Sequence, residues 1–232
     1  MPFLQRILES VSKKDFPLDI LFRKEWQTTS LSVDSTGDVF LSHSEPKILN
    51  LLADWFDKEL FAHSLRVRDV AKEMAKHFKV DVEKASLAGL LHDFGRGIRE
   101  ADMLSEAKKL NIPVNYVEKI NPCLLHAPLG GKLVVSRLGI KDVDTINAIS
   151  RHTVGEPQMS DLDMVVYIAD MIEPARSFSD LEKIRDFGHK RLLEVFELAY
   201  VCTLYHLLKW KKFIHPKSFE VWNWIQSSKI EE

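Results

Sequence analysis

Apolar residues recur at helical spacing from about Pro46 to the end of the chain, and this pattern limits the fold more than any other feature of the sequence. The first clear amphipathic stretch is marked by Ile48, Leu51, Leu52, Trp55 and Phe56. Helices that bury one face show this spacing of three to four residues. A later stretch, LLEVFELAYVCTLYHLLKW, is apolar on nearly every side, which places it deep in the bundle or at a subunit contact. The main body is therefore predicted to be all-α.

The beginning of the chain has a different pattern. Apolar residues between Phe3 and Val11 are spaced as in a helix, whereas TTSLSV, DSTG and DVFLS indicate a strand, a turn and a second strand. We therefore predict two parts. Residues 1–45 form a small appendage of a helix plus a β-hairpin, whose role the sequence does not indicate, and residues 46–232 form one helical domain.

Composition excludes several classes of protein. The hydrophobic content of 45% and the charged content of 28% are ordinary for a globular protein. A formal net charge of −2 creates no positive field for nucleic acid, so an anionic ligand would need a local site. The two cysteines, Cys123 and Cys202, show no CxxC pattern and are expected to be reduced. No uncharged apolar run is long enough to span a bilayer, and no signal peptide is recognisable, so we expect a cytoplasmic protein without membrane contact.

Capping residues predict several helix ends. Asp81 can cap the helix that carries KASLAGLLHD, and Ser160 with Asp163 resembles a capping box before MVVYIAD. Gly139 is a natural C-terminal stop after VVSRL. Pro128 suits the first position of a helix, which would leave His126 just ahead of a helix N-terminus, where free backbone N–H groups favour phosphate.

Histidines and aspartates lie on faces of these helices that are otherwise apolar. His63 shares a stripe with Val67, Val70 and Met74, although a lone histidine in such a place is more often a hydrogen-bonded core residue. His92 continues a stripe of small residues, and Asp93 next to it opposes the helix dipole at a C-terminus. A carboxylate buried there without a cation or hydrogen-bond donors would be costly.

Two further positions follow the same pattern. Asp170 follows a run of apolar and aromatic residues, and His152 shares a stripe with Thr145, Ala148 and Ile149. Several such groups that face one interior from separate helices predict a metal site. Imidazole and carboxylate ligands without thiolates suit iron, manganese, magnesium or zinc in a hydrolytic role. Such a metal lowers the pKa of bound water and polarises a phosphoryl oxygen.

The ordered set His63, His92-Asp93 and Asp170 resembles the signature of the HD-domain metal-dependent phosphohydrolases. The segments HSLRV, KASLAGLLHDFGRG, HAPLGGKLVV and INAISRHTVGEPQMSDLDMVVYIADMIEPARSF are similar to those of the YqeK family, the symmetrical bis(5'-nucleosyl)-tetraphosphatases of bacteria. The resemblance implies an all-α HD fold and the hydrolysis of diadenosine tetraphosphate to two ADP. It also implies iron, as one or two ions, with manganese or magnesium as alternatives. The expected partner is a small-molecule dinucleoside polyphosphate, and a homodimer is one option for assembly.

The resemblance implies roles for individual residues as well. His63, His92, Asp93 and Asp170 would hold the metal, and Asp93 would take part in catalysis. His126 and His152 would contact the polyphosphate and stabilise or protonate the departing ADP, or else complete a second metal site. The other substrate-binding residues that it implies are Arg96, Thr153, Arg176, His215, Pro216, Lys217 and Ser218.

Three residues depart from the family pattern. Arg96 stands where lysine is frequent, which keeps the charge but changes its geometry, and Met171 replaces a common tyrosine. Glu156 stands where a basic residue is frequent, so the substrate preference is left open. One alternative keeps the metal centre and changes the substrate to a deoxynucleotide, guanosine tetraphosphate or a cyclic nucleotide. Another alternative is a nucleotide-binding regulator that does not turn over.

Overall fold

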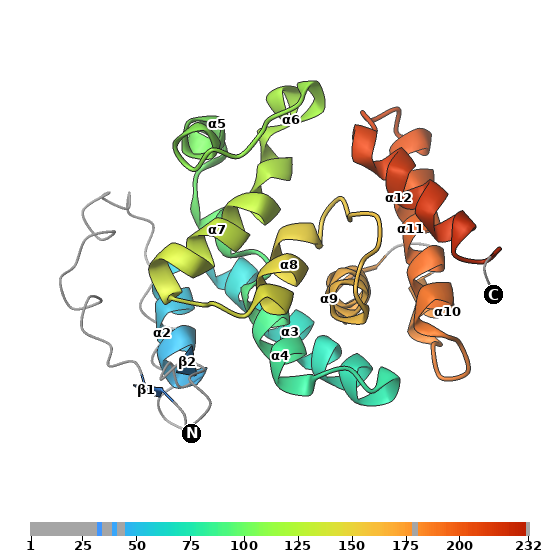
Figure 1. The fold of residues 1–232 in the computed structure, drawn as a ribbon, viewed down its shortest axis with the longest axis horizontal. Coiled ribbons are helices and arrows are strands. Elements are labelled where there is room, and N and C mark those ends of the chain that lie inside the picture. The colour runs from blue at the N-terminus through green and yellow to red at the C-terminus, as the bar shows by residue number, and fades with distance from the viewer. Residues whose placement is uncertain (1–31, 34–38, 41–44, 178–180, 231–232) are drawn as a thin grey trace. The chain divides into compact units, whose positions relative to one another are not determined.

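The computed structural model describes residues 32–33, 39–40, 45–177 and 181–230 (Figure 1). The chain divides into two compact units, residues 1–58 and 59–232. In the first unit, β1 (Ser32–Val33) and β2 (Val39–Phe40) pair in antiparallel orientation, and α2 (Glu45–Trp55) follows them. This pairing agrees with the two predicted strands. The predicted helix over residues 3–11 and the turn at 34–37 lie outside the described residues, and the domain boundary after residue 45 stays a prediction.

The body of the protein is helical, as predicted. Its longest helices are α3 (Lys58–Phe78) and α11 (Leu192–Lys209). The other α-helices are α4 (Val82–Leu91), α5 (Glu100–Lys109), α6 (Tyr116–Ile120), α7 (His126–Leu138), α8 (Val143–Arg151), α9 (Asp161–Ile172), α10 (Leu181–Arg185) and α12 (Pro216–Ser227). Two short 3₁₀ helices are η3 (Phe94–Gly97) and η4 (Pro122–Leu125). Among the residues that the structure describes, no helix has the length and apolar character that a membrane span requires.

Local capping chemistry sets several helix ends, as the sequence predicts. The Asp81 carboxylate accepts hydrogen bonds from two backbone N–H groups in the first turn of α4. Ser160 and Asp163 form the predicted capping box at the start of α9. Gly139 ends α7 with a φ of 62°, a left-handed conformation that glycine adopts without a steric penalty. The structure thus confirms these three predictions. They could be made from the sequence because each helix end depends only on residues that are close together in the chain.

The start of α7 differs from the prediction. α7 begins at His126 rather than at Pro128, because η4 runs directly into it and the His126 N–H donates to the carbonyl of Cys123. Pro128 is tolerated in the first turn, where its missing N–H would have had no partner within the helix. The expected position of His126 ahead of the helix is therefore wrong, since His126 is the first residue of α7 and its own N–H group is already used by η4.

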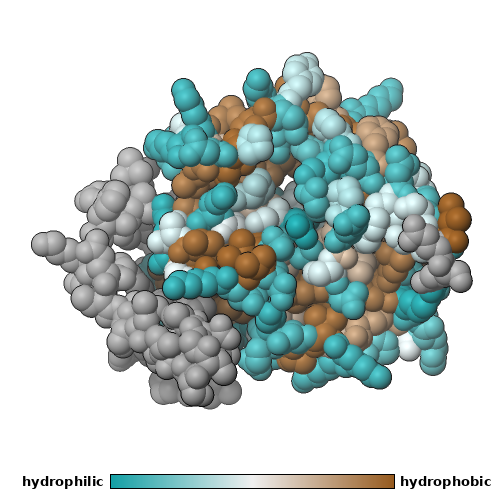
Figure 2. All heavy atoms as spheres, viewed as in Figure 1, coloured by the Kyte–Doolittle hydropathy of each residue, from teal (hydrophilic) through white to brown (hydrophobic). Residues whose placement is uncertain are grey.

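The helices of the second unit pack so that several of their ends meet. α7 packs on η3 and α8, α8 packs on α4 and α9, and α9 packs on α11. Figure 1 shows α7, α8 and α9 in the middle, between α5 with α6 on one side and α10, α11 and α12 on the other. Side chains with no exposed surface come from five of these helices: Val67, Leu91, Ile149, Val166 and Phe196. On the face drawn in Figure 2, apolar residues form separate patches among hydrophilic ones.

Candidate metal centre

Four histidines and two aspartates converge at the junction of α3, α4, α7, α8 and α9. Two of them lie within helices: His63 on α3 and Asp170 on α9. The other four stand at helix ends: His92 after α4, Asp93 before η3, His126 at the start of α7 and His152 after α8. The four histidines and Asp93 are buried, whereas the Asp170 side chain is 24% exposed. The cluster is therefore reached from solvent on the side of Asp170.

The four predicted metal ligands lie in direct contact. The Nε2 atom of His63 is 3.0 Å from Oδ1 of Asp170 and 3.2 Å from Nε2 of His92. The Nε2 atom of His92 is 3.4 Å from Oδ2 of Asp93. The structure therefore brings His63, His92, Asp93 and Asp170 to one place, and the ligand atoms of His63, His92 and Asp170 lie within 4.8 Å of one another, close enough to share a cation. The ligand atoms of His92, Asp93 and His152 form a second group of this kind.

Asp93 also contacts the remaining two histidines through its other oxygen. Its Oδ1 atom is 3.2 Å from Nε2 of His126 and 3.6 Å from Nε2 of His152. The Nε2 atoms of His126 and His152 are 3.0 Å apart, and the Thr153 hydroxyl lies 2.9 Å from the first and 3.1 Å from the second. Asp93 thus stands between two sets of ligands, one facing each carboxylate oxygen.

In each of the four histidines of the cluster, the other ring nitrogen, Nδ1, faces an oxygen that can only accept a hydrogen bond. The Nδ1 atoms of His92, His126 and His152 donate to the carbonyl groups of Gly89, Cys123 and Ile149 at 2.8, 2.5 and 2.8 Å. His63 Nδ1 donates to Oε1 of Glu173 at 3.2 Å. Each Nε2 atom of a neutral ring therefore carries a lone pair that points into the cluster. Metal-binding histidines are usually fixed in this way.

These lone pairs and carboxylate oxygens repel one another unless a positive charge lies among them. Burial would raise the pKa of Asp93, but the attraction of His92 and the hydrogen bonds with His126 and His152 hold it well below its usual range. Burial would lower the pKa of His126, yet hydrogen bonds with Asp93 and Cys123 raise it to about 9. A proton on His126 can thus supply the positive charge, and a metal cation that replaced it would meet nitrogen and oxygen donors only. The arrangement fits a divalent metal ion.

Two arginines flank the cluster. Arg96 Nε donates to Oδ1 of Asp93 at 2.6 Å, and Arg176 Nη2 donates to Oδ1 of Asp170 at 2.7 Å. Their side chains are 38% and 44% exposed, so each guanidinium group keeps donors that a ligand from solvent can reach. Both residues belong to the predicted substrate-binding set, and Thr153 from the same set lies at the cluster as described above.

The other predicted substrate-binding residues lie at the start of α12. His215 Nε2 is 2.6 Å from Nδ2 of Asn115, and the Lys217 ammonium pairs with Glu156 in the loop after α8. Pro216 and Ser218 belong to the same turn. These polar contacts join α12 to α6 and to that loop, not to the histidines of the cluster. A role for His215, Pro216, Lys217 and Ser218 therefore stays a prediction.

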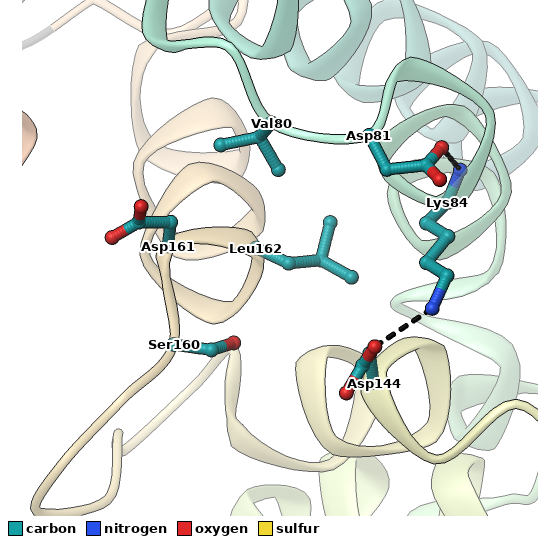
Figure 3. Close-up of a pocket in the computed structure, with 7 residues that line it drawn as sticks. All are labelled: Val80, Asp81, Lys84, Asp144, Ser160, Asp161 and Leu162. Carbon is teal, nitrogen blue, oxygen red and sulfur yellow. Dashed lines mark hydrogen bonds and ion pairs between the residues drawn. The ribbon is translucent and has the colours of Figure 1, made fainter.

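A pocket of about 310 Å³ lies apart from the cluster, at the N-terminal ends of α4, α8 and α9 (Figure 3). Lys84, which lines it, forms ion pairs of 2.7 Å with both Asp142 and Asp144. Asp144 lines the pocket too, and so do Asp81 and Asp161. An anionic nucleotide would meet carboxylates there and an ammonium group that is already neutralised, so we do not assign the substrate to this pocket.

Sequence reasoning missed Glu173, which contacts the ring nitrogen of His63 that faces away from the cluster. The side chain is buried, and its Oε2 atom accepts hydrogen bonds from Nε of Arg66 at 2.5 Å and from the Ala175 N–H at 2.8 Å. Its Oε1 atom accepts the hydrogen bond from His63 described above. An acidic residue directly after a buried apolar helix was the signal that pointed to Asp93, and the same signal could have found Glu173.

Replacement of Glu173 with glutamine is expected to weaken metal binding by about 10–100-fold, the usual cost of losing a carboxylate behind a metal-binding histidine. The amide can place its NH₂ group toward His63 and so favour the wrong tautomer. Titration of the metal-free protein with Mn²⁺ or Fe²⁺ measures the change. Glu182→Gln is the matched control, because that side chain is 85% exposed. Equal affinities for the two variants would contradict the assigned role.

The comparisons with known proteins agree with this geometry. The model of the HD domain family matches residues 60–175. The symmetrical bis(5'-nucleosyl)-tetraphosphatase of Bacillus subtilis is 32% identical over 72% of this chain and 89% of its own. The protein of the same name from Halalkalibacterium halodurans is 31% identical over 76% of this chain and 94% of its own.

A solved structure is also similar. The crystal structure of a predicted HD superfamily hydrolase involved in NAD metabolism, from Clostridium acetobutylicum, has a TM-score of 0.76 and 31% identity, over 80% of this chain and 98% of that one. The family model spans half of the chain, and the two curated relatives align over most of their length. The chain therefore belongs to the HD domain family of metal-dependent hydrolases, in the group of the symmetrical bis(5'-nucleosyl)-tetraphosphatases.

Proposed function

We propose that this protein hydrolyses diadenosine tetraphosphate symmetrically and releases two ADP. The observation that carries the proposal is the cluster of four imidazole Nε2 atoms and two carboxylates, with Arg96 and Arg176 on its flanks. Curated relatives in which the same fold spans most of the chain are named for this reaction. The substrate combines several phosphate charges, which such a site neutralises, with a bond that a water molecule can break.

We propose iron as the metal, as one or two ions, with manganese or magnesium as alternatives. His63, His92, Asp93 and Asp170 would hold one ion, and His126 and His152 would complete a second set with Asp93. When bound, the metal supplies charge neutralisation and lowers the pKa of a water molecule. The donor set of nitrogen and oxygen atoms without sulfur is compatible with these metals, and the support for iron in particular comes from the family resemblance.

The residues of the chain itself would neutralise and orient the polyphosphate. Arg96 lies beside Asp93 and Arg176 beside Asp170, so one guanidinium group is available on each flank of the cluster. Planar guanidinium groups bind phosphate oxygens in pairs, which fixes the direction of the chain of phosphates. In phosphoryl transfer, such positioning accounts for most of the catalysis.

The cleavage step needs one water molecule and one proton for the leaving group. The oxygen of water bonds to an inner phosphorus, and the bond from that phosphorus to the central bridging oxygen breaks. His126 or His152 stabilises the negative charge that develops on the departing ADP, or donates a proton to it. The Thr153 hydroxyl contacts both rings and can hold them in a fixed orientation relative to each other. Two ADP molecules account for all atoms of the substrate and the water.

We also propose that the first turn of α12 contacts the nucleoside part of the substrate. The Lys217–Glu156 ion pair ties this turn to the loop that follows His152 and Thr153. His215, Pro216 and Ser218 share the turn with Lys217. A substrate that extends from the cluster along this loop would reach them.

Product analysis tests the proposed function. We expect ADP as the sole product from diadenosine tetraphosphate, and a loss of activity of about 100-fold or more after chelation, restored by Fe²⁺ or Mn²⁺. A mixture of AMP and ATP would show asymmetric cleavage and contradict the proposal. A panel with deoxynucleotides, guanosine tetraphosphate and cyclic nucleotides tests the alternative substrates. Binding without turnover of any of them would favour the regulator instead.

A further inference from the structure

Arg185 of α10 binds the end of α9 and the turn that follows it, residues 173–176. Its Nε atom donates to the carbonyl oxygen of Ile172 at 3.1 Å, and its Nη2 atom donates to the carbonyl oxygens of Glu173 and Arg176 at 3.1 and 3.0 Å. The last carbonyl groups of a helix have no partner within it, and a basic side chain can bind them. Here one planar group also binds both ends of the 173–176 turn.

α10 carries Arg185 on a helix that is anchored in the core. Leu181 is 2% exposed and Ile184 has no exposed surface. The Nη1 atom of Arg185 forms an ion pair of 2.8 Å with Glu182, whose side chain is 85% exposed. An exposed pair of this kind contributes little to stability. The position of the guanidinium group is therefore set by the packing of α10 and by the three carbonyl groups.

The 173–176 turn orients the carboxylate of Glu173. The backbone carbonyl of Glu173 accepts hydrogen bonds from Arg185 and from the Arg176 N–H, the latter at 2.9 Å. Its Oε2 atom accepts from the Ala175 N–H inside the same turn, while its Oε1 atom accepts from Nδ1 of His63. A change in the shape of the turn would therefore move the carboxylate relative to the His63 ring.

The same turn fixes the backbone of Arg176. The Arg176 N–H is bound to the Glu173 carbonyl, and the Arg176 carbonyl is bound to Arg185. Its side chain extends to the metal cluster, where Nε and Nη2 donate to the carbonyl oxygen and to Oδ1 of Asp170. A side chain that starts from a fixed backbone has less freedom to lose when it binds a ligand. The hold of Arg185 on the turn therefore favours phosphate binding by Arg176.

We propose that Arg185 is a positioning residue of the site, which acts through the 173–176 turn on both His63 and Arg176. The effect on Arg176 rests on the proposed function, whereas the effect on His63 requires only that the cluster binds a metal. A helix cap without any influence on the site is the alternative. Such a cap would affect stability alone, and the two measurements below separate it from a positioning role.

Metal affinity tests the effect on His63. We expect Arg185→Met to raise the dissociation constant for Mn²⁺ by about 10-fold, the lower end of the cost of losing a group that orients a metal ligand. Arg185→Lys keeps the charge but not the planar set of donors, and should give an intermediate increase. It also provides the test if Arg185→Met does not fold.

Two matched controls separate positioning from stability and charge. Ile184→Val destabilises the same helix but leaves the guanidinium group in place. Glu182→Gln removes only the exposed ion pair. Both should bind Mn²⁺ as the wild type does. Arg185 variants that bind Mn²⁺ as tightly as Ile184→Val would overturn the proposal. A wild-type protein that binds neither Mn²⁺ nor Fe²⁺ would contradict the metal centre itself.

Kinetics at saturating Mn²⁺ test the effect on Arg176. We expect Arg185→Met to raise KM for diadenosine tetraphosphate by about 10-fold, equivalent to one lost hydrogen bond with a charged group, and to change kcat less. Because Arg185 acts through Arg176, adding Arg185→Met to Arg176→Met should raise KM little further. Additive increases would overturn this part of the proposal. If the wild type does not cleave this substrate, the proposed function fails, and the Mn²⁺ titrations still decide the part that concerns His63.

Discussion

Asp93→Ala is expected to reduce turnover by roughly 10²–10⁴-fold, the range for loss of a catalytic group, and to remove bound metal from the protein. Both oxygens of Asp93 face the cluster, Oδ2 toward His92 and Oδ1 toward His126 and His152. Loss of this one carboxylate therefore disturbs both sets of ligands. The substitution also removes the negative charge of the Asp93 carboxylate, which favours binding of a metal cation between the histidine Nε2 atoms.

The fold should survive this change. Asp93 precedes η3, but its side chain makes no capping hydrogen bond to the backbone there. Its partner Arg96 is partly exposed and can be solvated after the substitution. Circular dichroism, metal analysis and an activity assay on one preparation separate the two effects. Asp69→Ala, on an aspartate of α3 whose side chain is 63% exposed, is the matched control. Metal content and turnover equal to those of the control would falsify the assigned centre.

Gly95→Ala should have the largest effect on stability. A Cβ atom at this position would lie 2.1 Å from the carbonyl oxygen of His126 and 2.9 Å from the backbone nitrogen of Gly130. Both atoms belong to the backbone of α7, so no side-chain rotation can relieve the overlap. η3 and α7 would have to separate, which would move His126 away from Asp93. Activity should fall together with stability.

We expect Gly95→Ala to cost about 3 kcal/mol, the upper end of the usual range for overpacking. For a chain of this size the melting temperature should fall by roughly 6–12 °C. Gly188→Ala is the matched control, because Gly188 is exposed and a Cβ atom there would have no neighbour within 4 Å. Thermal unfolding of the two variants measures the difference, and a Gly95→Ala protein as stable as the control would exclude the close contact between η3 and α7.

Much of the fold could be predicted because it depends on neighbouring residues. Helical spacing of apolar side chains identified the all-α body, and Asp81, Ser160 and Gly139 set helix ends through bonds within a few residues. The same spacing showed that His63 and His152 point inward. It failed at the start of α7, where η4 continues into the helix, because the sequence pattern does not show how a preceding turn uses backbone N–H groups.

The sequence by itself thus determined which side chains face the interior and which type of chemistry they can perform. Only the tertiary structure decided that Asp93 places one oxygen toward His92 and the other toward His126 and His152, and that Glu173 holds His63 from a position 110 residues away. It also decided that half of α11 is left exposed. Such contacts join helices that are far apart in the chain, and their geometry depends on the packing of the whole bundle. A periodic pattern fixes the inward face of one helix but not the partner that this face will meet.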